Sequence, residues 1–161
     1  DIQKLIALIV DRGGMVKNLH GQKNVYYQVN ATYFSALGES EQKLLLARAI
    51  QIFMPGKPQI WYLDLFAGKN DHEAVKEAGE GGHKEINRTN LTDIQIRQAL
   101  QTGVVQKQLE LLRFRSTSRA FTEDADIQIQ SDGRKLMIRW SNSAAAAQLD
   151  VDFETGSFVI S

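Results

Sequence analysis

The run QIWYLDLF, residues 59–66, constrains the fold of this chain more than any other segment. Its apolar residues are nearly continuous rather than alternating, which is typical of a strand buried on both faces of a parallel sheet. No other segment carries this pattern, and one parallel strand cannot form a sheet. Two interpretations follow: the partner strands lie outside this chain, or the run is not a strand.

The length and the first residue favour missing partner strands. The chain has 161 residues, enough for one domain or for one domain and a part of another. It begins with Asp1 rather than Met, and no signal-like segment precedes its first apolar run. We therefore expect the chain to be a piece of a longer protein.

The composition excludes several classes of function. With 19 basic and 19 acidic residues the net charge is zero, which argues against nucleic acid or an anionic membrane as the main partner. No segment approaches the roughly 18 apolar residues of a membrane span. The absence of cysteine excludes disulfides, thiolate catalysis and a cysteine zinc site. These features lead us to expect a cytoplasmic protein.

Local signals divide the rest of the chain into helices followed by strands. A helix is predicted over 2–10, ended by Gly13–Gly14, and another after the N-cap Ser40, ended by MPGKP at 54–58. Further helices are predicted over 72–78, over 93–101 behind the cap Thr92, and over 104–115. After Phe121, period-two alternation and Asp-Gly and Thr-Gly turns predict an antiparallel meander. We place a domain boundary near 121–124.

Candidate catalytic residues are few. His20, His72 and His83 have no neighbouring nucleophile and no partner at helical i, i+4 spacing, so no metal site is predicted and each is interpreted as a loop or helix-start histidine. Asp64 lies at the end of the apolar run, where barrels and doubly wound sheets carry active sites. It serves equally well as a cap for the next turn.

Two polar segments carry the remaining signals. YYQVNATYFSAL, residues 26–37, combines aromatic rings with amides and hydroxyls, which suits a sugar but also describes an ordinary tyrosine-rich loop. GGHKEINRTNL, residues 81–91, has only two apolar residues. Its composition fits a solvated connector and a ligand-gripping loop equally well.

Several segments together resemble one known family. These are YYQVNATYFSALGESEQKLLLARAIQIFMPGKPQIWYLDLFAGKND, GGHKEINR and VVQKQLELLRFRSTSRAF, which keep their order and spacing between about Ile6 and Phe121. They resemble the C-terminal part of the sucrose phosphorylase group in the α-amylase superfamily. The C-terminal strands match that group in character only.

The resemblance implies an α/β fold that supplies the missing strands. The chain would be the C-terminal portion of a (β/α)8 TIM barrel, with its last strand and flanking helices, followed by a small antiparallel β-domain C. Residues 1–121 would belong to the barrel, with an active-site excursion over 15–37, and residues 122–161 would form domain C. QIWYLDLF would then be the eighth barrel strand.

The resemblance also implies a retaining α-glucoside phosphorylase. Members transfer a glucosyl group from sucrose or a similar glucoside to phosphate, which is a co-substrate, and use no cofactor or metal. Their catalytic carboxylates correspond to positions upstream of this chain. We therefore nominate no catalytic residue here, expect the chain alone to be inactive, and expect the N-terminal part of the barrel to be its partner.

Three substrate-binding residues follow from the resemblance. Tyr27 and Gln28 match a mobile loop pair beside the acceptor site, and Arg88 matches an arginine that holds the donor glucose. Relatives acting on sucrose 6-phosphate tend to have histidine in place of Tyr27, which favours an acceptor without phosphate. The family usually continues INRH where this chain has Thr89, which weakens the case for fructose and keeps glucosylglycerol-type substrates open.

Two other functions remain as alternatives. A hydrolase or transglucosidase of the same superfamily would share the barrel and domain C, but the YQVN and GGHKEINR motifs favour the phosphorylases. A non-catalytic carbohydrate-binding module would fold completely without upstream sequence, which the unpaired strand disfavours. The sequence does not predict the acceptor or the oligomeric state.

Overall fold

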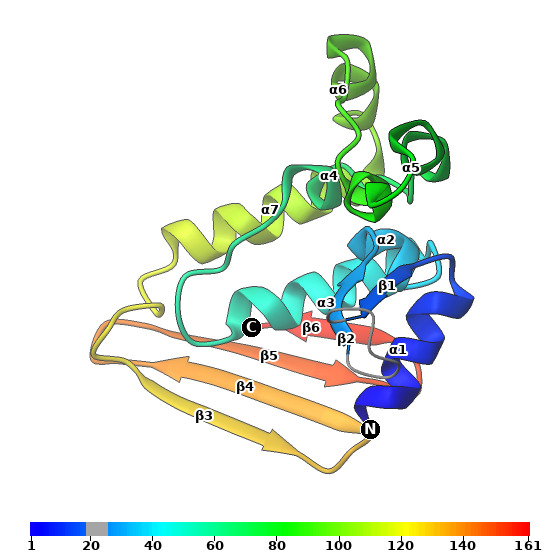
Figure 1. Cartoon of the computed structure of the whole chain (residues 1–161). Coiled ribbons are helices and arrows are strands. Elements are labelled where there is room, and N and C mark those ends of the chain that lie inside the picture. Colours follow the sequence, from blue (N-terminus) through cyan, green and yellow to red (C-terminus); the bar gives the residue numbers. More distant parts are fainter. Residues whose placement is uncertain (19–25) are drawn as a thin grey trace. The chain divides into compact units, whose positions relative to one another are not determined.

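A computed structural model describes residues 1–18 and 26–161 of the chain (Figure 1). The described residues form two compact units, each made of two chain segments. Unit 1 comprises residues 1–41 and 60–102, and unit 2 comprises residues 42–59 and 103–161.

Unit 1 consists of short helices and one hairpin. Its elements are α1 (Ile2–Asp11), β1 (Met15–Asn18), β2 (Tyr26–Asn30), α2 (Tyr33–Ala36), α4 (Tyr62–Leu65), α5 (His72–Ala78), the 3₁₀ helix η2 (Gly82–Asn87) and α6 (Asp93–Ala99). The predicted helices over 2–10, 72–78 and 93–101 are confirmed within two residues. Thr92 caps α6 in a capping box with Gln95, which satisfies backbone N–H groups that the first helical turn leaves without partners.

Helix α1 keeps a bare apolar face. It ends where Gly13 adopts a positive φ of 82°, a left-handed conformation that glycine takes without steric cost. Ile2, Leu5, Leu8 and Val10 nevertheless remain exposed, and none of its residues is buried. The described residues of this chain therefore leave the apolar side of α1 uncovered.

The predicted strand over 59–66 is wrong in this structure. Residues 62–65 form helix α4, and the preceding residues belong to no strand. An apolar run of this length does not distinguish a strand from a buried helical turn, and a strand is stable only with a hydrogen-bonded neighbour. Leu63 is buried, whereas Trp61 and Tyr62 are exposed. The run therefore supplies one core residue and two exposed rings.

Unit 2 packs two helices against one face of an antiparallel sheet (Figure 1). It contains α3 (Glu41–Phe53), apart from its first residue, and α7 (Gly103–Thr117). Its strands are β3 (Asp126–Ser131), β4 (Lys135–Ser141), β5 (Ala146–Asp152) and β6 (Ser157–Ile160), in sequential order. The predicted meander is therefore confirmed.

The register of the strands places one apolar row in the core. Ile129, Ile138, Leu149 and Ile160 face one another across the four strands, and the two central ones are fully buried. Ile138 and Leu149 pack with Phe53 of α3 and Leu111 of α7 in one continuous core cluster, with Ile160 packed against it. Ile129, on the edge strand β3, stays 49% exposed. Alternation of period two thus buries one face of the sheet and leaves the other polar.

The compact units do not divide at the predicted boundary near 121–124. That position marks the change from helices to strands, because β3 begins at Asp126. Helices α3 and α7 nevertheless belong to the same unit as the sheet, since their apolar faces are buried against it. The assignment of residues 1–121 to a barrel and 122–161 to domain C stays a prediction.

None of the helices formed by the described residues is long and apolar enough to cross a membrane. Nor do the described residues contain a group of three histidine, cysteine or carboxylate side chains placed to hold a metal ion.

Candidate active-site loops

The loop that carries Arg88 is shaped by two small residues and one apolar anchor. Gly81 has a φ of 85°, and η2 begins directly after it. Gly82 is buried, and a Cβ added there would lie 2.6 Å from the Cβ of Ala78. Ile86 is fully buried within η2, while Lys84 and Glu85 beside it stay partly accessible. One anchored turn therefore holds a polar loop at the surface, and it is not a free connector.

Two aromatic side chains hold the backbone on both sides of Arg88. The indole Nε1 of Trp61 donates to the carbonyl oxygen of Asn87 at 2.9 Å, and the hydroxyl of Tyr62 donates to the carbonyl oxygen of Thr89 at 2.6 Å. Both rings come from the segment predicted to be a barrel strand. The two rings stay exposed because each of them forms a hydrogen bond to the Arg88 loop through its polar tip and does not pack in the core.

Asp71 holds the same loop from another direction. Its backbone N–H donates to the carbonyl of Ile86 at 2.9 Å, and its carboxylate accepts the hydroxyl of Thr89 at 2.8 Å. Its other carboxylate oxygen accepts the Ala74 N–H at 2.9 Å and caps α5. The hydrogen bonds from Ala74 and Thr89 lower the pKa of Asp71.

Arg88 itself is not committed to a strong contact among the described residues. Its Nη1 lies 3.5 Å from an oxygen of Glu85, and the two side chains are 52% and 41% exposed. An exposed ion pair of this length contributes little to stability. The backbone of Arg88 is thus fixed while its guanidinium stays available for a ligand.

Of the other predicted substrate-binding residues, only Gln28 has a described side chain. Tyr27 and Gln28 both lie in β2, and Gln28 pairs with Lys17 of β1. The Oε1 atom of Gln28 is buried and has no hydrogen-bond partner. The side chain of Tyr27, and the whole of His20, lie outside the described residues. Strands β1 and β2 each contact η2, which carries the loop to Arg88.

Buried amides with incomplete hydrogen bonding occur around this hairpin. Besides Gln28, they are Asn18 through Oδ1, Asn30 through Nδ2 and Asn70 through Nδ2. A buried polar atom without a partner costs about 1–3 kcal/mol, so such atoms are uncommon outside sites that bind water or a ligand. Two of these amides, Gln28 and Asn30, lie in the segment 26–37 and have an acceptor and a donor that the described residues leave unused. The sugar-binding interpretation of that segment stays a prediction.

The start of α2 is held by one side chain of α4 and by one that follows α4. Asp64 accepts the N–H of Tyr33 at 2.7 Å, and Asn70 accepts the N–H of Thr32 at 2.7 Å. Asp64 thus holds the start of a helix upstream of it, whereas one of its two interpretations predicted a cap for the turn that follows it. Its interpretation as an active-site residue stays a prediction. Asn70 and Asp71 were not predicted as site residues. Asp71 directly precedes the helix predicted over 72–78, and an aspartate in this position is a typical N-cap.

A polar hollow of about 440 Å³ lies beside this network. It is lined by Lys69, Asn70, Asp71, His72, Glu73 and Thr89. Lys69 forms an ion pair with Glu39 at 2.5 Å, which lowers the pKa of Glu39, and Asp71 is bonded to Thr89. Its polar groups therefore support neighbouring segments, and His72 at its edge is an exposed helix-start histidine, as expected.

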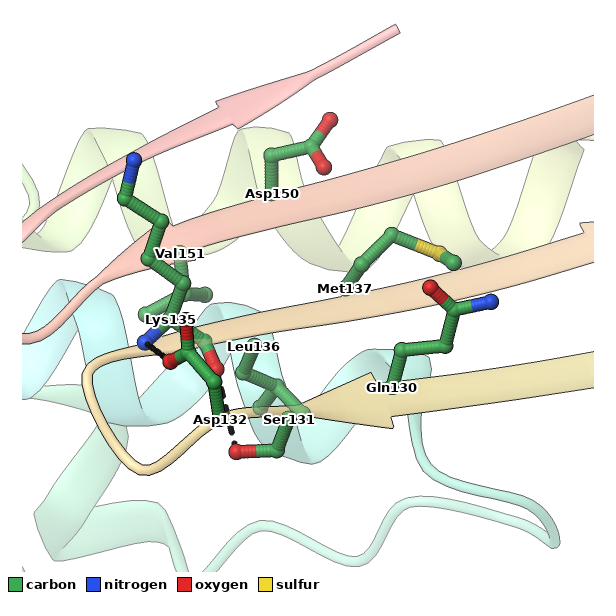
Figure 2. Close-up of a pocket in the computed structure, with 8 residues that line it drawn as sticks. All are labelled: Gln130, Ser131, Asp132, Lys135, Leu136, Met137, Asp150 and Val151. Atoms are coloured by element: carbon green, nitrogen blue, oxygen red, sulfur yellow. Dashed lines mark hydrogen bonds between the residues drawn. The ribbon is translucent and has the colours of Figure 1, made fainter.

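A second hollow, of about 380 Å³, lies on the sheet of unit 2. Figure 2 shows Gln130, Met137 and Asp150 on the side of the sheet that faces away from the helices. Asp132 accepts the N–H of Lys135 at 2.7 Å, and Ser131 donates to the carbonyl of Lys135 at 3.0 Å (Figure 2). These bonds close the β3–β4 turn, so the polar groups there have a structural role.

Comparison with known proteins gives a consistent set of relatives. No protein-family model matches the chain. The chain is 51% identical over 162 residues to a sucrose 6(F)-phosphate phosphorylase of Ilumatobacter coccineus, a match that covers 99% of this chain and 31% of that protein. It is 40% identical over 134 residues to a sucrose phosphorylase of Agrobacterium vitis, covering 83% of this chain and 27% of that one. It is 36% identical over 135 residues to a glucosylglycerol phosphorylase of Marinobacter adhaerens, and this match covers 84% of this chain and 27% of that protein.

A solved structure matches the fold over nearly the whole chain. The crystal structure of the sucrose 6F-phosphate phosphorylase from Thermoanaerobacter thermosaccharolyticum superposes with a TM-score of 0.90 at 35% sequence identity. The match covers 98% of this chain and 32% of that one. This chain therefore spans about a third of the length of the relatives that it matches.

Proposed function

Because this chain belongs to the sucrose phosphorylase-like glycoside phosphorylases and has the fold of their C-terminal part, we propose that it is part of a retaining α-glucoside phosphorylase. That fold is α/β: the C-terminal portion of a (β/α)8 barrel followed by a small antiparallel domain. The whole protein would transfer a glucosyl group from sucrose or a sucrose-like glucoside to phosphate. The products would be α-glucose 1-phosphate and the free acceptor sugar.

The reaction divides into two displacements at the anomeric carbon. A carboxylate attacks that carbon and forms a glucosyl-enzyme, while a second carboxyl group protonates the departing acceptor oxygen. Phosphate then attacks the same carbon, gives up a proton to the second carboxylate and releases the first one. We assign both carboxylates to the N-terminal part of the barrel, so this chain contributes binding groups and would be inactive alone.

Within this chain, Arg88 would hold the donor glucose. A guanidinium suits this task because its planar set of N–H groups can serve a carboxylate and a sugar hydroxyl together. The observation that carries this assignment is the fixation of the loop by Trp61, Tyr62 and Asp71, with the guanidinium itself left exposed. Tyr27 and Gln28, on β2, would line the acceptor side.

A phosphorylated donor is the second candidate. Two relatives that match 99% and 95% of this chain are named sucrose 6(F)-phosphate phosphorylases. Their identities of 51% and 38% favour a donor whose departing acceptor sugar carries the phosphate group. Tyr27 argues in the opposite direction, because histidine is expected at this position in that branch. A glucosylglycerol-type acceptor is supported by Thr89 and by the relative of that name.

The experiment is a phosphorolysis assay of the full-length protein. Sucrose, sucrose 6-phosphate and glucosylglycerol are supplied in turn, with and without inorganic phosphate, and glucose 1-phosphate and free glucose are both measured. We expect phosphate-dependent release of glucose 1-phosphate from at least one of the three. Free glucose released at the same rate without phosphate would show a hydrolase instead, and sugar binding without turnover would show a binding module.

A further inference from the structure

Asn70 lies at the base of the hairpin formed by β1 and β2. Its Oδ1 accepts the backbone N–H of Thr32 at 2.7 Å, two residues after β2 ends at Asn30. A Cβ added to Gly13, two residues before β1 begins at Met15, would lie 3.7 Å from the Nδ2 atom of Asn70. Because the register of the hairpin pairs Met15 with Asn30, one side chain lies beside both segments that enter and leave it.

The hydrogen bonds between Asn70 and the end of β2 form a closed, buried set. The backbone N–H of Asn70 donates to the hydroxyl oxygen of Ser35 at 3.0 Å. Thr32 in turn accepts the N–H of Ser35 at 3.2 Å and so caps α2. Thr32 is 1% exposed and Ser35 is 3% exposed, so water competes little for these bonds. The chain that follows β2 is therefore fixed to the position of Asn70.

The backbone around Asn70 is itself held on both sides. A Cβ added to Gly68 would lie 2.3 Å from the Cδ1 atom of Leu63, which is a buried residue, so the chain packs closely there. Directly after Asn70, the N–H of Asp71 donates to the carbonyl oxygen of Ile86 at 2.9 Å. A side chain on a backbone supported in this way can determine the position of another segment.

We propose that Asn70 is a positioning residue for the acceptor sugar. The proposal rests on the proposed function, in which Tyr27 and Gln28 of β2 line the acceptor side. Asn70 would act on the acceptor through β2 alone. The fixed chain at Thr32 determines where the hydrogen-bonded strand before it lies, and with it Gln28. A misplacement of about 1 Å in such a group can lower a reaction rate by about 100-fold.

Use of the donor should not depend on the Asn70 side chain. The loop that carries Arg88 is held by the side chains of Trp61 and Tyr62. Asn70 takes part in neither of these hydrogen bonds. Loss of the Thr32 bond should therefore affect the acceptor and leave formation of the glucosyl-enzyme nearly unchanged. The ratio of transfer to hydrolysis measures this difference, because the acceptor hydroxyl and water attack the same glucosyl-enzyme.

The test uses the full-length protein with glucose 1-phosphate as the donor. Fructose, fructose 6-phosphate and glycerol are supplied in turn below saturation, and the transfer product and free glucose are measured together. With the acceptor that the wild type uses best, Asn70→Ala should lower the ratio of transfer to hydrolysis about tenfold. Hydrolysis without an acceptor should stay within about twofold of the wild-type rate. An unchanged ratio, or an equal loss of transfer and hydrolysis, would overturn the proposal.

A conservative variant and a matched control separate positioning from stability. Asn70→Asp keeps an acceptor for the Thr32 N–H, and the Nδ2 atom that it loses has no hydrogen-bond partner among the described residues. We expect its ratio to stay close to that of the wild type, and a loss as large as in Asn70→Ala would rule out the Thr32 bond as the cause. Asn142→Ala is the control, because Asn142 accepts the N–H of Ala144 at 2.8 Å in a turn of unit 2. It should lose stability without a change in the ratio.

Ser35→Ala keeps the test decisive if Asn70→Ala does not fold. This variant removes the hydroxyl oxygen that accepts the Asn70 N–H, so it loosens the same junction from the side of α2. The ratio of transfer to hydrolysis should fall in the same direction, by a smaller factor. A ratio equal to that of Asn142→Ala would count against the proposal.

Failure of the proposed function is distinguishable from failure of this role. If the wild-type protein releases no glucose 1-phosphate from any donor and forms no transfer product, the phosphorylase assignment is wrong and the acceptor role of Asn70 falls with it. If the wild type is a phosphorylase while Asn70→Ala and Ser35→Ala keep its ratio, the function holds and Asn70 only supports the fold.

Discussion

The hydroxyl of Thr89 donates a 2.8 Å hydrogen bond to a carboxylate oxygen of Asp71, whose other oxygen caps helix α5. One carboxylate thereby ties the residue after Arg88 to the start of a helix. Hydrogen bonds to a charged group contribute about 1.5–3 kcal/mol, more than bonds between neutral groups. This pair is therefore a main determinant of where Arg88 lies.

Thr89→Val should weaken substrate use without unfolding the protein. Valine keeps the shape of threonine but removes the donor, so the Arg88 loop loses one of its fixed points. We expect kcat/KM of the full-length protein to fall by about tenfold, since about 1.4 kcal/mol corresponds to that factor. Thr102→Val is the matched control, because the Thr102 hydroxyl donates to the carbonyl of Ala99 within its own turn. Equal kinetics in the two variants would contradict the role of Thr89.

The Asp71 carboxylate should make stability depend on acidic pH. Its folded pKa is lowered by the Ala74 N–H and the Thr89 hydroxyl, so its ionised form is stabilising above the unfolded pKa of about 3.9. That contribution is lost as the pH falls through the lower folded value. Asp71→Asn keeps the cap but has no charge to lose. The difference in Tm between wild type and Asp71→Asn should therefore shrink as the pH falls from 6 to 3 in thermal melts, and a difference independent of pH would argue against it.

Arg88→Ala should remove most turnover while the fold survives. The side chain is half exposed and its pair with Glu85 is long, so we expect the free energy of unfolding to change by less than about 0.5 kcal/mol. Glu85→Gln is the control, because it breaks the same pair without removing the guanidinium. Kinetics and melts of both variants separate the two roles. Arg88→Ala with wild-type kinetics would remove Arg88 from the donor site.

Gly82→Ala should destabilise the loop that carries Arg88, because the added Cβ would clash with residues of α5. An added Cβ would lie 2.6 Å from the Cβ of Ala78 and 2.9 Å from the carbonyl oxygen of Val75, closer than real contacts allow. Overpacking of this kind costs about 1–3 kcal/mol. Gly103→Ala provides the comparison, because nothing lies within 4 Å of its added Cβ. Chemical denaturation should show a loss of stability for Gly82→Ala and none for Gly103→Ala.

The two tryptophans should respond differently to replacement by phenylalanine. Trp140 is buried in the core of unit 2, and its indole Nε1 donates to the carbonyl of Phe53 at 2.7 Å. The guanidinium carbon of Arg115 lies 4.7 Å from the centroid of the Trp140 ring. Its loss leaves a buried carbonyl without a partner, so we expect about 2–3 kcal/mol of destabilisation. Trp61 is 49% exposed and fixes the Arg88 loop. Trp61→Phe should lower kcat/KM while leaving Tm nearly unchanged. A larger loss of stability in Trp61→Phe than in Trp140→Phe would contradict these two roles.

Much of the secondary structure followed from local rules. Gly13–Gly14 ended α1, Thr92 capped α6, and period-two alternation predicted the four-stranded sheet. The apolar run 59–66 was the exception, because it combines a buried Leu63 with exposed rings whose polar tips bind a distant loop. Hydrophobicity alone does not distinguish a buried core residue from an exposed aromatic ring that forms a hydrogen bond to a distant loop. The resemblance singled out Arg88, but no local signal pointed to Thr89, Tyr62 or Trp61 as its supports.

The sequence by itself determined the periodic elements, the small residues and caps that end them, and the relation to the glycoside phosphorylases. Each of these depends on neighbouring residues or on motifs read in order along the chain. The tertiary structure alone decided that Tyr62 and Asp71 would meet Thr89, and that Asp64 would accept the N–H of Tyr33. These pairs are far apart in sequence, and their hydrogen bonds and charges interact only after packing has brought the segments together.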